Sequence, residues 1–450
     1  MSTGTMRNSG IEWIGDVPAH WEFKRLKYAS TLAGRIGWQG LTSEEYRTEG
    51  VHLVTGTDFK EGRIDWDNCV RVSKARWAEA TQVQLQEGDL LITKDGTVGK
   101  VAICRNMPNK ASLNSGVMVI RQKVPMSTRF LYWVLQSPVF GGWFSDVNAG
   151  ASTISHLYQA DFYNFGFYMP PTAREQEQVA AVLDVETAKI DHAIDLLRQQ
   201  LETLEQLKKS IIHEAVTKGL DPTVPMKPSG IEWIGDIPEG WECRRLKYLA
   251  TEPGTLFIDG DWIESDVIVP EGIRYLTTGN VGTGYYKEQG WGHITRRTFV
   301  SLSCLKVIPG DILISRLNLP IGRCCLAPDD EEEYVVAVDV CVFRPNSECD
   351  KRYLVYCMNT DGYASAGERA ARGATMQRIS RSLLGSFVVP IPPFEEQQAI
   401  SDYLDAKCET MDKTLAVKRE QLELLRQQRG SLIFEYVTGK QRVRWHDGCR

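Results

Sequence analysis

Two loops of this chain combine glycine, hydroxyl and basic residues, the side-chain chemistry that binds phosphates and base edges. One loop follows the run 89–93, and the other follows the similar run 311–315. Glycine lets a backbone approach a phosphate closely, hydroxyl and basic side chains pair with it, and Arg or Asn can reach base edges. The candidate residues in these loops are Lys94, Thr97, Lys100, Arg316, Asn318 and Arg323.

A second pair of loops has the same character. Each begins at a glycine, Gly150 or Gly373, which precedes hydroxyl, amide or basic side chains, and the second copy is markedly basic. An ordinary turn with solvated charges would have a similar composition, so this alternative stays open for each single residue. The candidates in this pair are Ser152, Thr153, Ser155, His156, Arg369, Arg372, Thr375, Gln377 and Arg378.

Several short patterns resemble parts of catalytic sites, but each lacks a residue that the chemistry needs. The segment 391–394, IPPF, has isoleucine where amino-DNA methyltransferases need an Asn or Asp oxygen to accept from the target amine. Gly99-Lys100 ends like a phosphate-binding P-loop, yet Lys94 stands at the first glycine and Val101 at the magnesium-binding hydroxyl. The glycines of 279–284 have the wrong spacing for an S-adenosylmethionine fingerprint. We therefore predict no catalytic centre.

Metal ligands and disulfides are not indicated either. The chain has 11 cysteines but no C-x-x-C pair, and its 7 histidines never occur at H-E-x-x-H spacing. We expect no structural metal and no disulfide framework.

An internal duplication organises the chain and must position these loops. Residues 9–31 recur at 229–251 with 16 of 23 positions identical, which chance does not produce. Weaker matches follow in the same order, from the two candidate loops to the segments 170–176 and 392–397. Each half is therefore one module used twice.

Within each module, short β-rich runs alternate with Gly and Pro turns and brief helical stretches, which predicts an α+β globular domain. After the proline pairs 170–171 and 392–393, apolar residues fall at three- and four-residue steps. This pattern predicts two long amphipathic helices with a narrow apolar seam. A surface helix packed on its own domain is the alternative, but the length of the seam favours pairing of the two helices.

The order domain, helix, domain, helix determines the expected topology. If the duplicated halves occupy equivalent positions, the second helix must run back along the first. We therefore expect two globular α/β domains separated by two long helices that form an antiparallel coiled coil, with a pseudo-two-fold internal repeat. The expected segments are 1–170 (first domain), 171–226 (helix and linker), 227–390 (second domain) and 391–450 (helix and tail).

Together these features resemble the specificity subunits of type I restriction-modification enzymes. The resemblance covers nearly the whole chain. It rests on the doubled SGIEWIGDxP box ahead of W-x-x-x-RLKY, the doubled proline pair followed by Glu-Gln, and the linking stretch 214–223, EAVTKGLDPT. The second helix ends at FEYVTGKQ, which matches that stretch only in part.

The resemblance implies a DNA-binding, non-catalytic subunit with two target recognition domains. Each domain would read half of a bipartite site, and the divergence of the two domains implies an asymmetric site. The implied partners are double-stranded DNA, two modification (methyltransferase) subunits and restriction/translocase subunits. The chain itself would bind no cofactor, because S-adenosylmethionine belongs to the modification subunit and ATP and Mg to the restriction subunit.

Composition leaves other classes open but excludes some. The net charge of −6 argues mildly against nucleic acid, although basic loops can be local. No apolar run is long enough to span a bilayer and no signal pattern appears, so we expect a soluble, cytoplasmic protein. A coiled-coil adaptor without a DNA role, and a self-sufficient DNA methyltransferase or nuclease, remain as alternatives.

Overall fold

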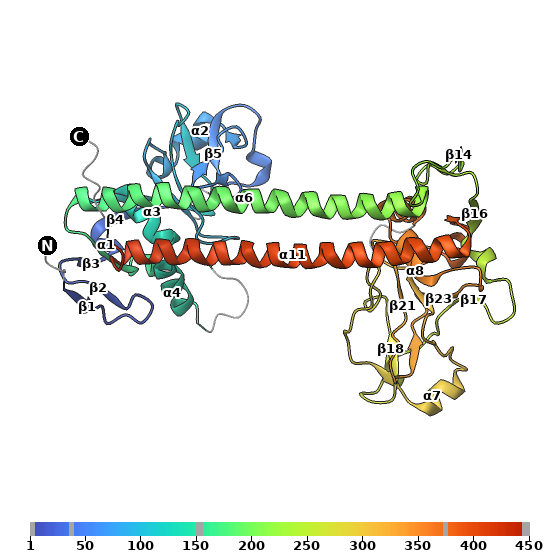
Figure 1. Cartoon of the computed structure of the whole chain (residues 1–450). Coiled ribbons are helices and arrows are strands. Elements are labelled where there is room, and N and C mark those ends of the chain that lie inside the picture. Colours follow the sequence, from blue (N-terminus) through green and yellow to red (C-terminus); the bar gives the residue numbers. More distant parts are fainter. Residues whose placement is uncertain (1–4, 36–39, 150–155, 372–376, 443–450) are drawn as a thin grey trace. The chain divides into compact units, whose positions relative to one another are not determined.

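The computed structural model describes residues 5–35, 40–149, 156–371 and 377–442. The chain divides into two compact units, of which unit 1 comprises residues 1–198 and 420–450 and unit 2 comprises residues 199–419 (Figure 1). Both units are α+β, as predicted from the sequence.

Unit 1 contains most of the first module. Its strands are β1 Met6–Asn8, β2 Asp16–Pro18, β3 Glu22–Arg25, β4 Ser30–Ala33, β5 Val51–Val54, β6 Phe59–Lys60, β7 Arg63–Ile64, β8 Val70–Val72, β9 Leu90–Thr93, β10 Val101–Ile103, β11 Ala111–Leu113, β12 Val117–Gln122 and β13 Gly166–Met169. Its short helices are α1 Leu26–Ala29, α2 Lys74–Ala78, α3 Thr128–Gln136, α4 Pro138–Val147 and α5 Gln159–Phe162.

Unit 2 repeats this order. Its strands are β14 Met226–Pro228, β15 Asp236–Pro238, β16 Glu242–Arg245, β17 Leu256–Asp259, β18 Ile273–Leu276, β19 His293–Ile294, β20 Ile312–Ser315, β21 Cys324–Leu326, β22 Tyr334–Val336, β23 Val340–Arg344 and β24 Val388–Ile391. Its short helices are α7 Arg296–Ser301, α8 Lys351–Met358, α9 Asp361–Ala370 and α10 Arg381–Leu384, and the 3-10 turn η4 spans Leu246–Ala250.

The sheet topology confirms the duplication. Unit 1 has a four-stranded sheet in the order β10-β9-β12-β4, and unit 2 has its counterpart β21-β20-β23-β17. Each unit also has a three-stranded sheet, β11-β5-β8 or β22-β18-β19, in which the first two strands run parallel. The strands that precede the candidate loops, β9 and β20, are fully buried and are interior strands of the four-stranded sheets.

An ion pair between a buried aspartate and a partly exposed arginine repeats in both four-stranded sheets. Asp89 accepts two hydrogen bonds from Arg121, and Asp311 accepts two from Arg344. Asp311 is fully buried. The aspartate of each GD-x-L-I run is therefore structural, because it satisfies an arginine that crosses the sheet from the neighbouring strand.

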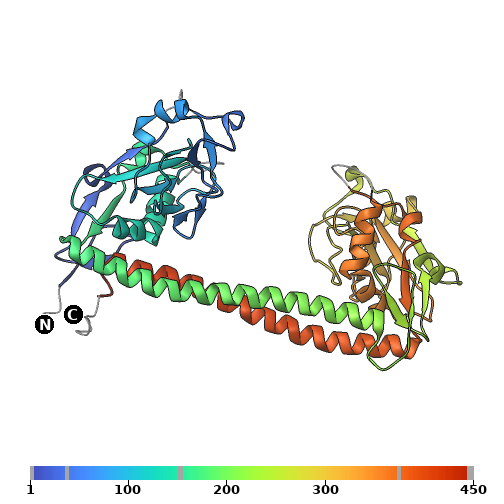
Figure 2. The same ribbon diagram turned by 90° about the horizontal axis from the view of Figure 1, so that it is seen from above.

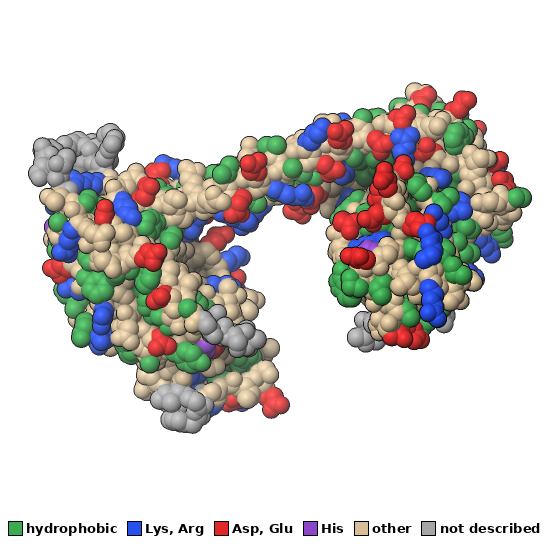
Figure 3. Space-filling model, turned by 90° about the horizontal axis from the view of Figure 1, so that it is seen from below, with side chains coloured by type: hydrophobic (Ala, Val, Ile, Leu, Met, Phe, Trp, Pro, Cys, Tyr) green, Lys and Arg blue, Asp and Glu red, His purple; other side chains and the backbone are tan. Residues whose placement is uncertain are grey.

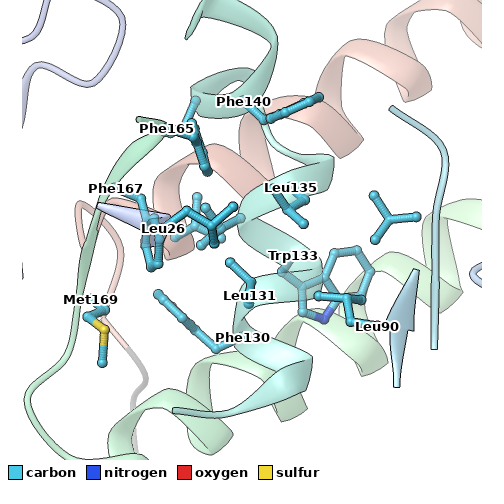
Figure 4. Packing of buried hydrophobic residues seen from close by; sticks show 14 of the residues in the cluster. Leu26, Leu90, Phe130, Leu131, Trp133, Leu135, Phe140, Phe165, Phe167 and Met169 are labelled. Carbon is cyan, nitrogen blue, oxygen red and sulfur yellow. The ribbon is translucent and has the colours of Figure 1, made fainter. Parts of the chain in front are cut away.

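The hydrophobic core of unit 1 lies between its four-stranded sheet, α3 and the start of the long helix. Aromatic and aliphatic side chains such as Phe130, Leu131 and Phe165 interdigitate there (Figure 4). Ile433, Tyr436 and Val437, at the far end of the chain, join the same cluster. Unit 2 repeats this arrangement with Ala215 and Val216 in its own core. Each domain core is therefore completed by the end of the helix that arrives from the other module.

Two long helices confirm the predicted seam. Helix α6 spans Ala173–Lys218 (46 residues) and α11 spans Phe394–Val437 (44 residues). In unit 2, Gln200 bonds Lys418 and Lys208 pairs with Asp412, so residue numbers rise along one helix as they fall along the other. In unit 1, Asp191 pairs with Arg429 at 2.7 Å. Within each unit the two helices are therefore antiparallel neighbours, as Figure 2 also shows.

The entry to each long helix is built in the same way twice. Gln176 accepts from the Ser127 amide and donates to the Pro170 carbonyl, and Gln397 does the same with Asp350 and Pro392. The preceding glutamates accept from the indole nitrogens of Trp21 and Trp241, each at 3.0 Å. The Glu-Gln pair after each proline pair thus ties the helix to its own domain.

The two helix ends are also equivalent, although their sequences match only in part. Gly219 and Gly439 follow the helices at φ of 76° and 70°. An added Cβ would lie 3.2 Å from Trp241 at Gly219, and 2.4 Å from Pro18 at Gly439. Only glycine combines a positive φ with so close an approach.

Candidate nucleic-acid interface

The first candidate loop of unit 1 is closed by a buried threonine. Thr93, at the end of β9, donates to the Thr97 carbonyl at 2.6 Å and accepts from the Lys100 amide at 3.0 Å. Gly96 and Gly99 take positive φ values, which let the loop turn back into β10. Lys94 is half-buried, whereas Thr97 and Lys100 are exposed. The loop is a defined turn with an accessible hydroxyl and ammonium group.

The structure brings the second loop of unit 1 to the first. The Leu157 amide donates to the Lys94 carbonyl at 3.0 Å, and the His156 ring contacts the Asp95 carboxylate. His156 is therefore held within the first loop by an acidic partner. The other candidates in this loop, Ser152, Thr153 and Ser155, lie outside the described residues.

Unit 2 joins its two loops at the equivalent place. The Ile379 amide donates to the Arg316 carbonyl, and the Asn318 amide donates to the Gln377 carbonyl, both at 3.0 Å. Asn318 takes a left-handed φ of 59° and is exposed. The same pairing of loops therefore recurs on different residues, so the backbone frame repeats while the displayed side chains differ.

Arg316 does not have the accessible position that its sequence context suggests. Its side chain is 4% exposed and its Nε lies 2.9 Å from an oxygen of Asp259. It also donates to the carbonyls of Ile379 and Val338. Because these bonds occupy the guanidinium inside the domain, Arg316 orders the two loops and cannot present that group to a ligand in this conformation.

Arg323 is likewise directed inward. Its guanidinium donates to five backbone carbonyls, and burial lowers its pKa below the ordinary value. The acceptors are Val281, Leu317, Asn318, Pro320 and Thr278. Arg323 therefore holds the loop 316–322 against the neighbouring loop 277–292, and in this conformation its guanidinium is engaged by these carbonyls.

The remaining basic candidates of unit 2 are accessible. Arg378 is 49% exposed and lies 2.8 Å from Asp339, and Arg369 is 61% exposed and lies 3.7 Å from Glu232. Gln377 is half-buried. Arg372 and Thr375 lie outside the described residues. Arg369 can exchange its solvated partner Glu232, which is 89% exposed, for phosphate at little cost, whereas Asp339, the partner of Arg378, is only 24% exposed.

The loop 277–292, to which Arg323 is bonded, is not among the sequence-predicted candidates and lies beside the loop 316–322. Asn280 accepts from the Thr277 amide and donates to the carbonyls of Lys287 and Gln289. This rigid loop exposes Tyr285 by 59% and Trp291 by 66%. Its signal in the sequence was faint: Thr277 and Asn280 correspond to Thr55 and Asp58, whose carboxylate also accepts from the Thr55 amide.

Acidic and basic side chains are interspersed on the face that Figure 3 shows, in keeping with the net charge of −6. Among the described residues, no group of three or more His, Cys, Asp or Glu side chains is placed to hold a metal ion. No helix in the described parts of the chain is long and apolar enough to cross a membrane.

A duplicated α+β fold with paired polar loops in each copy defines a two-module recognition protein. The family model for the type I restriction modification DNA specificity domain matches residues 42–206 and 238–424. The chain therefore belongs to this family of type I restriction-modification specificity proteins.

Relatives agree with this assignment. The chain is 24% identical over 442 residues to the putative type I restriction enzyme MjaX specificity subunit of Methanocaldococcus jannaschii, with 96% of each chain covered. It is 25% identical to the MjaVIII specificity subunit of the same organism, with 95% and 94% covered.

The fold is shared with two solved chains. One belongs to a structure described as the basis of complex assembly and conformational transition of the type I R-M system, with a TM-score of 0.70, 17% identity and coverage of 94% and 99%. The HsdS subunit of Thermoanaerobacter tengcongensis gives a TM-score of 0.50 at 16% identity, with coverage of 96% and 100%.

Proposed function

We propose that the chain is the non-catalytic subunit that reads a bipartite, asymmetric DNA site for a type I restriction-modification complex. Its target recognition domains would be 1–170 and 227–390, and 171–226 and 391–450 would be the conserved spacer helices with their linker and tail. The observation that carries the proposal is the pairing of polar loops on the same backbone frame in both units, with different exposed side chains. Two domains with the same backbone frame but different exposed side chains are suited to read two half-sites of different sequence.

The exposed candidates Thr97, Lys100, Asn318 and Arg378 and the half-buried Lys94 would contact DNA, with Arg316 and Arg323 positioning the loops. The proposed partners are two modification subunits, which would supply S-adenosylmethionine chemistry, and restriction subunits that use ATP and Mg. The chain alone should bind duplex DNA weakly, because its net charge is negative and its basic loops are small.

A gel-shift titration with and without modification subunits tests this function. We expect a gain in affinity for a specific duplex when the modification subunits are added, and no methyl transfer by the chain alone. Tight, strongly salt-dependent and specific binding by the isolated chain would contradict the proposal, and so would methyl transfer without a partner.

We expect Arg323→Lys to relax selectivity at the second half-site. An ammonium has three donors at one point and cannot reach the five carbonyls that the guanidinium joins. The ratio of specific to non-specific affinity should fall about tenfold, on the scale of one lost base contact. Competition binding with mismatched duplexes measures this ratio. Arg296→Lys is the matched control, because Arg296 lies in the same unit, is 62% exposed and is not among the residues proposed to contact DNA. An unchanged ratio in Arg323→Lys would show that the loop needs no such support.

The modification subunits should dock on the helices. Leu196 on α6 and Val417 on α11 occupy equivalent positions of the duplication and are 45% and 53% exposed. We expect Leu196→Asp to remove one modification subunit and the double variant with Val417→Asp to remove both, as measured by native mass spectrometry. Gln206→Asp, at another exposed position of α6, is the control for an added Asp side chain. Full assembly of the double variant would exclude this surface.

A further inference from the structure

The most similar stretch of the duplication contains exposed residues that the fold does not explain. Ile14, Trp21 and Leu26, with their counterparts in the second copy, are buried and belong to the domain cores. Arg25 and Tyr28 are also identical in both copies, as Arg245 and Tyr248, yet all four are exposed. Tyr28 is 67% exposed and Tyr248 is 54% exposed. Packing cannot account for the identity of such residues.

These residues have the same geometry in the two units. Lys27 Nζ lies 5.1 Å from the centre of the Tyr28 ring, and Lys247 Nζ lies 5.0 Å from that of Tyr248. The Lys27 amide donates to the Tyr163 carbonyl at 2.9 Å, and the Lys247 amide donates to the Gly385 carbonyl at 3.0 Å. We call Arg25, Lys27 and Tyr28 the first RKY patch, and Arg245, Lys247 and Tyr248 the second.

The charges of each patch are available to a ligand. The neighbouring acids are already neutralised, because Glu22 pairs with Lys24 at 2.7 Å and Glu242 pairs with Arg244 at 3.0 Å. Among the described residues, none of the four patch cations makes an ion pair with a carboxylate. Two basic groups and a phenol hydroxyl thus stand free at each patch, a donor set that matches phosphate oxygens.

The patches also adjoin the candidate interface. Tyr163, to which Lys27 is bonded, follows helix α5, which comes directly after the loop of His156. Gly385, to which Lys247 is bonded, follows α10, which comes directly after the loop of Arg378. Each patch therefore lies at the base of the second candidate loop of its unit.

We propose that the two RKY patches are sequence-independent anchors for the DNA backbone, one for each half-site. This inference rests on the proposed function. The two domains differ in the side chains of their reading loops, so they read different bases. The sugar-phosphate backbone is the part of the duplex that is the same at both half-sites, and identical exposed cations suit an identical ligand. A protein partner present twice is the competing occupant, and the exposed acids Glu12 and Asp16 of the same box suit a basic protein surface better than DNA.

The test uses the chain assembled with its modification subunits. Arg25→Gln with Lys27→Gln removes one patch, and Arg245→Gln with Lys247→Gln removes the other. Lys189→Gln with Lys413→Gln is the control of equal charge, because those exposed lysines pair with acids on their own helices. Affinity for specific and random duplexes is measured across a salt series, and native mass spectrometry follows assembly.

The logarithm of the DNA-binding constant falls linearly with the logarithm of the salt concentration. We expect each patch variant to make this fall less steep by about 1.8, because each of the two lost phosphate contacts contributes about 0.9 to the steepness. The affinity for specific and random DNA should fall by the same factor, about tenfold to a hundredfold at 0.1 M salt, so the methylated sequence stays unchanged. The control should keep the wild-type slope, and Lys27→Arg with Lys247→Arg should keep it too.

An unchanged slope, or a complex that loses a modification subunit, would overturn the inference in favour of a protein contact. A loss confined to particular base sequences would overturn it in favour of base reading. A wild-type complex that binds no DNA would contradict the proposed function as well, whereas wild-type binding with unaffected patch variants contradicts the inference alone.

Discussion

Replacing residues 252–386 by the same segment of a relative should change one half of the methylated DNA site completely and leave the other half unchanged. The segment lies between η4 and β24, so it contains the reading loops of unit 2 and helix α8, whose end at Asp350 contacts α11. Trp241, β16, β24 and both long helices lie outside the segment. The exchange therefore leaves in place the Trp241–Glu396 bond, the Gln397–Pro392 bond and the pairing of β16 with β24, which tie the domain to the helices. Because this frame recurs in unit 1, the hybrid should fold and assemble.

Methylation mapping of the hybrid measures the result. The matched exchange of residues 34–164, in unit 1, should change the opposite half of the site. A change in both halves from either exchange would show that the two units do not read DNA separately.

Ile433→Ala should destabilise the N-terminal domain, although residue 433 lies near the other end of the chain. Ile433 is fully buried in the unit 1 cluster with Phe130 and Val179. Truncating a buried isoleucine to alanine costs about 2–5 kcal/mol, because it removes apolar contacts and leaves a cavity. We expect the free energy of unfolding of unit 1 to fall by this amount, so that unit 1 melts at a lower temperature. The melting temperature of unit 2 should not change.

Hydrogen exchange locates this effect. Exchange should accelerate in α3 and α4 of unit 1 and stay slow in α8 of unit 2. Leu424→Ala is the control, because Leu424 lies on the same helix but is 56% exposed. Faster exchange confined to the last turns of α11 would mean that the helix end does not complete the core of unit 1.

The duplication, the α+β class and the two long helices could be predicted from the sequence because they depend on local patterns. Periodic apolar residues report a helix wherever it packs, and the identity of 9–31 with 229–251 needs no structure to be seen. The proline pair and Glu-Gln likewise mark both helix entries, whose bonds the structure then explains.

The roles of Arg316 and Arg323 could not be predicted in this way. An arginine next to a β-strand, as Arg316 is after β20 and Arg323 before β21, has the same sequence context whether its guanidinium faces solvent or turns inward. The direction of each guanidinium depends on partners that only the tertiary fold brings close. Asp259 pairs with Arg316, and the carbonyls of Thr278 and Val281 accept from Arg323. The equivalence of the two helix ends could not be predicted from the sequence either. It depends on the packing of Gly219 and Gly439 beside a tryptophan in each unit, not on identical residues along the helix ends.

The most direct test of the chain as a DNA-specificity protein is methylome sequencing of a host that carries the modification subunit with or without this chain. We predict methylation at a two-part, asymmetric motif with an unread gap when both are present, and none at that motif when this chain is absent. Methylation of the same motif by the modification subunit alone, or the absence of any new methylated motif when both are present, would contradict the account.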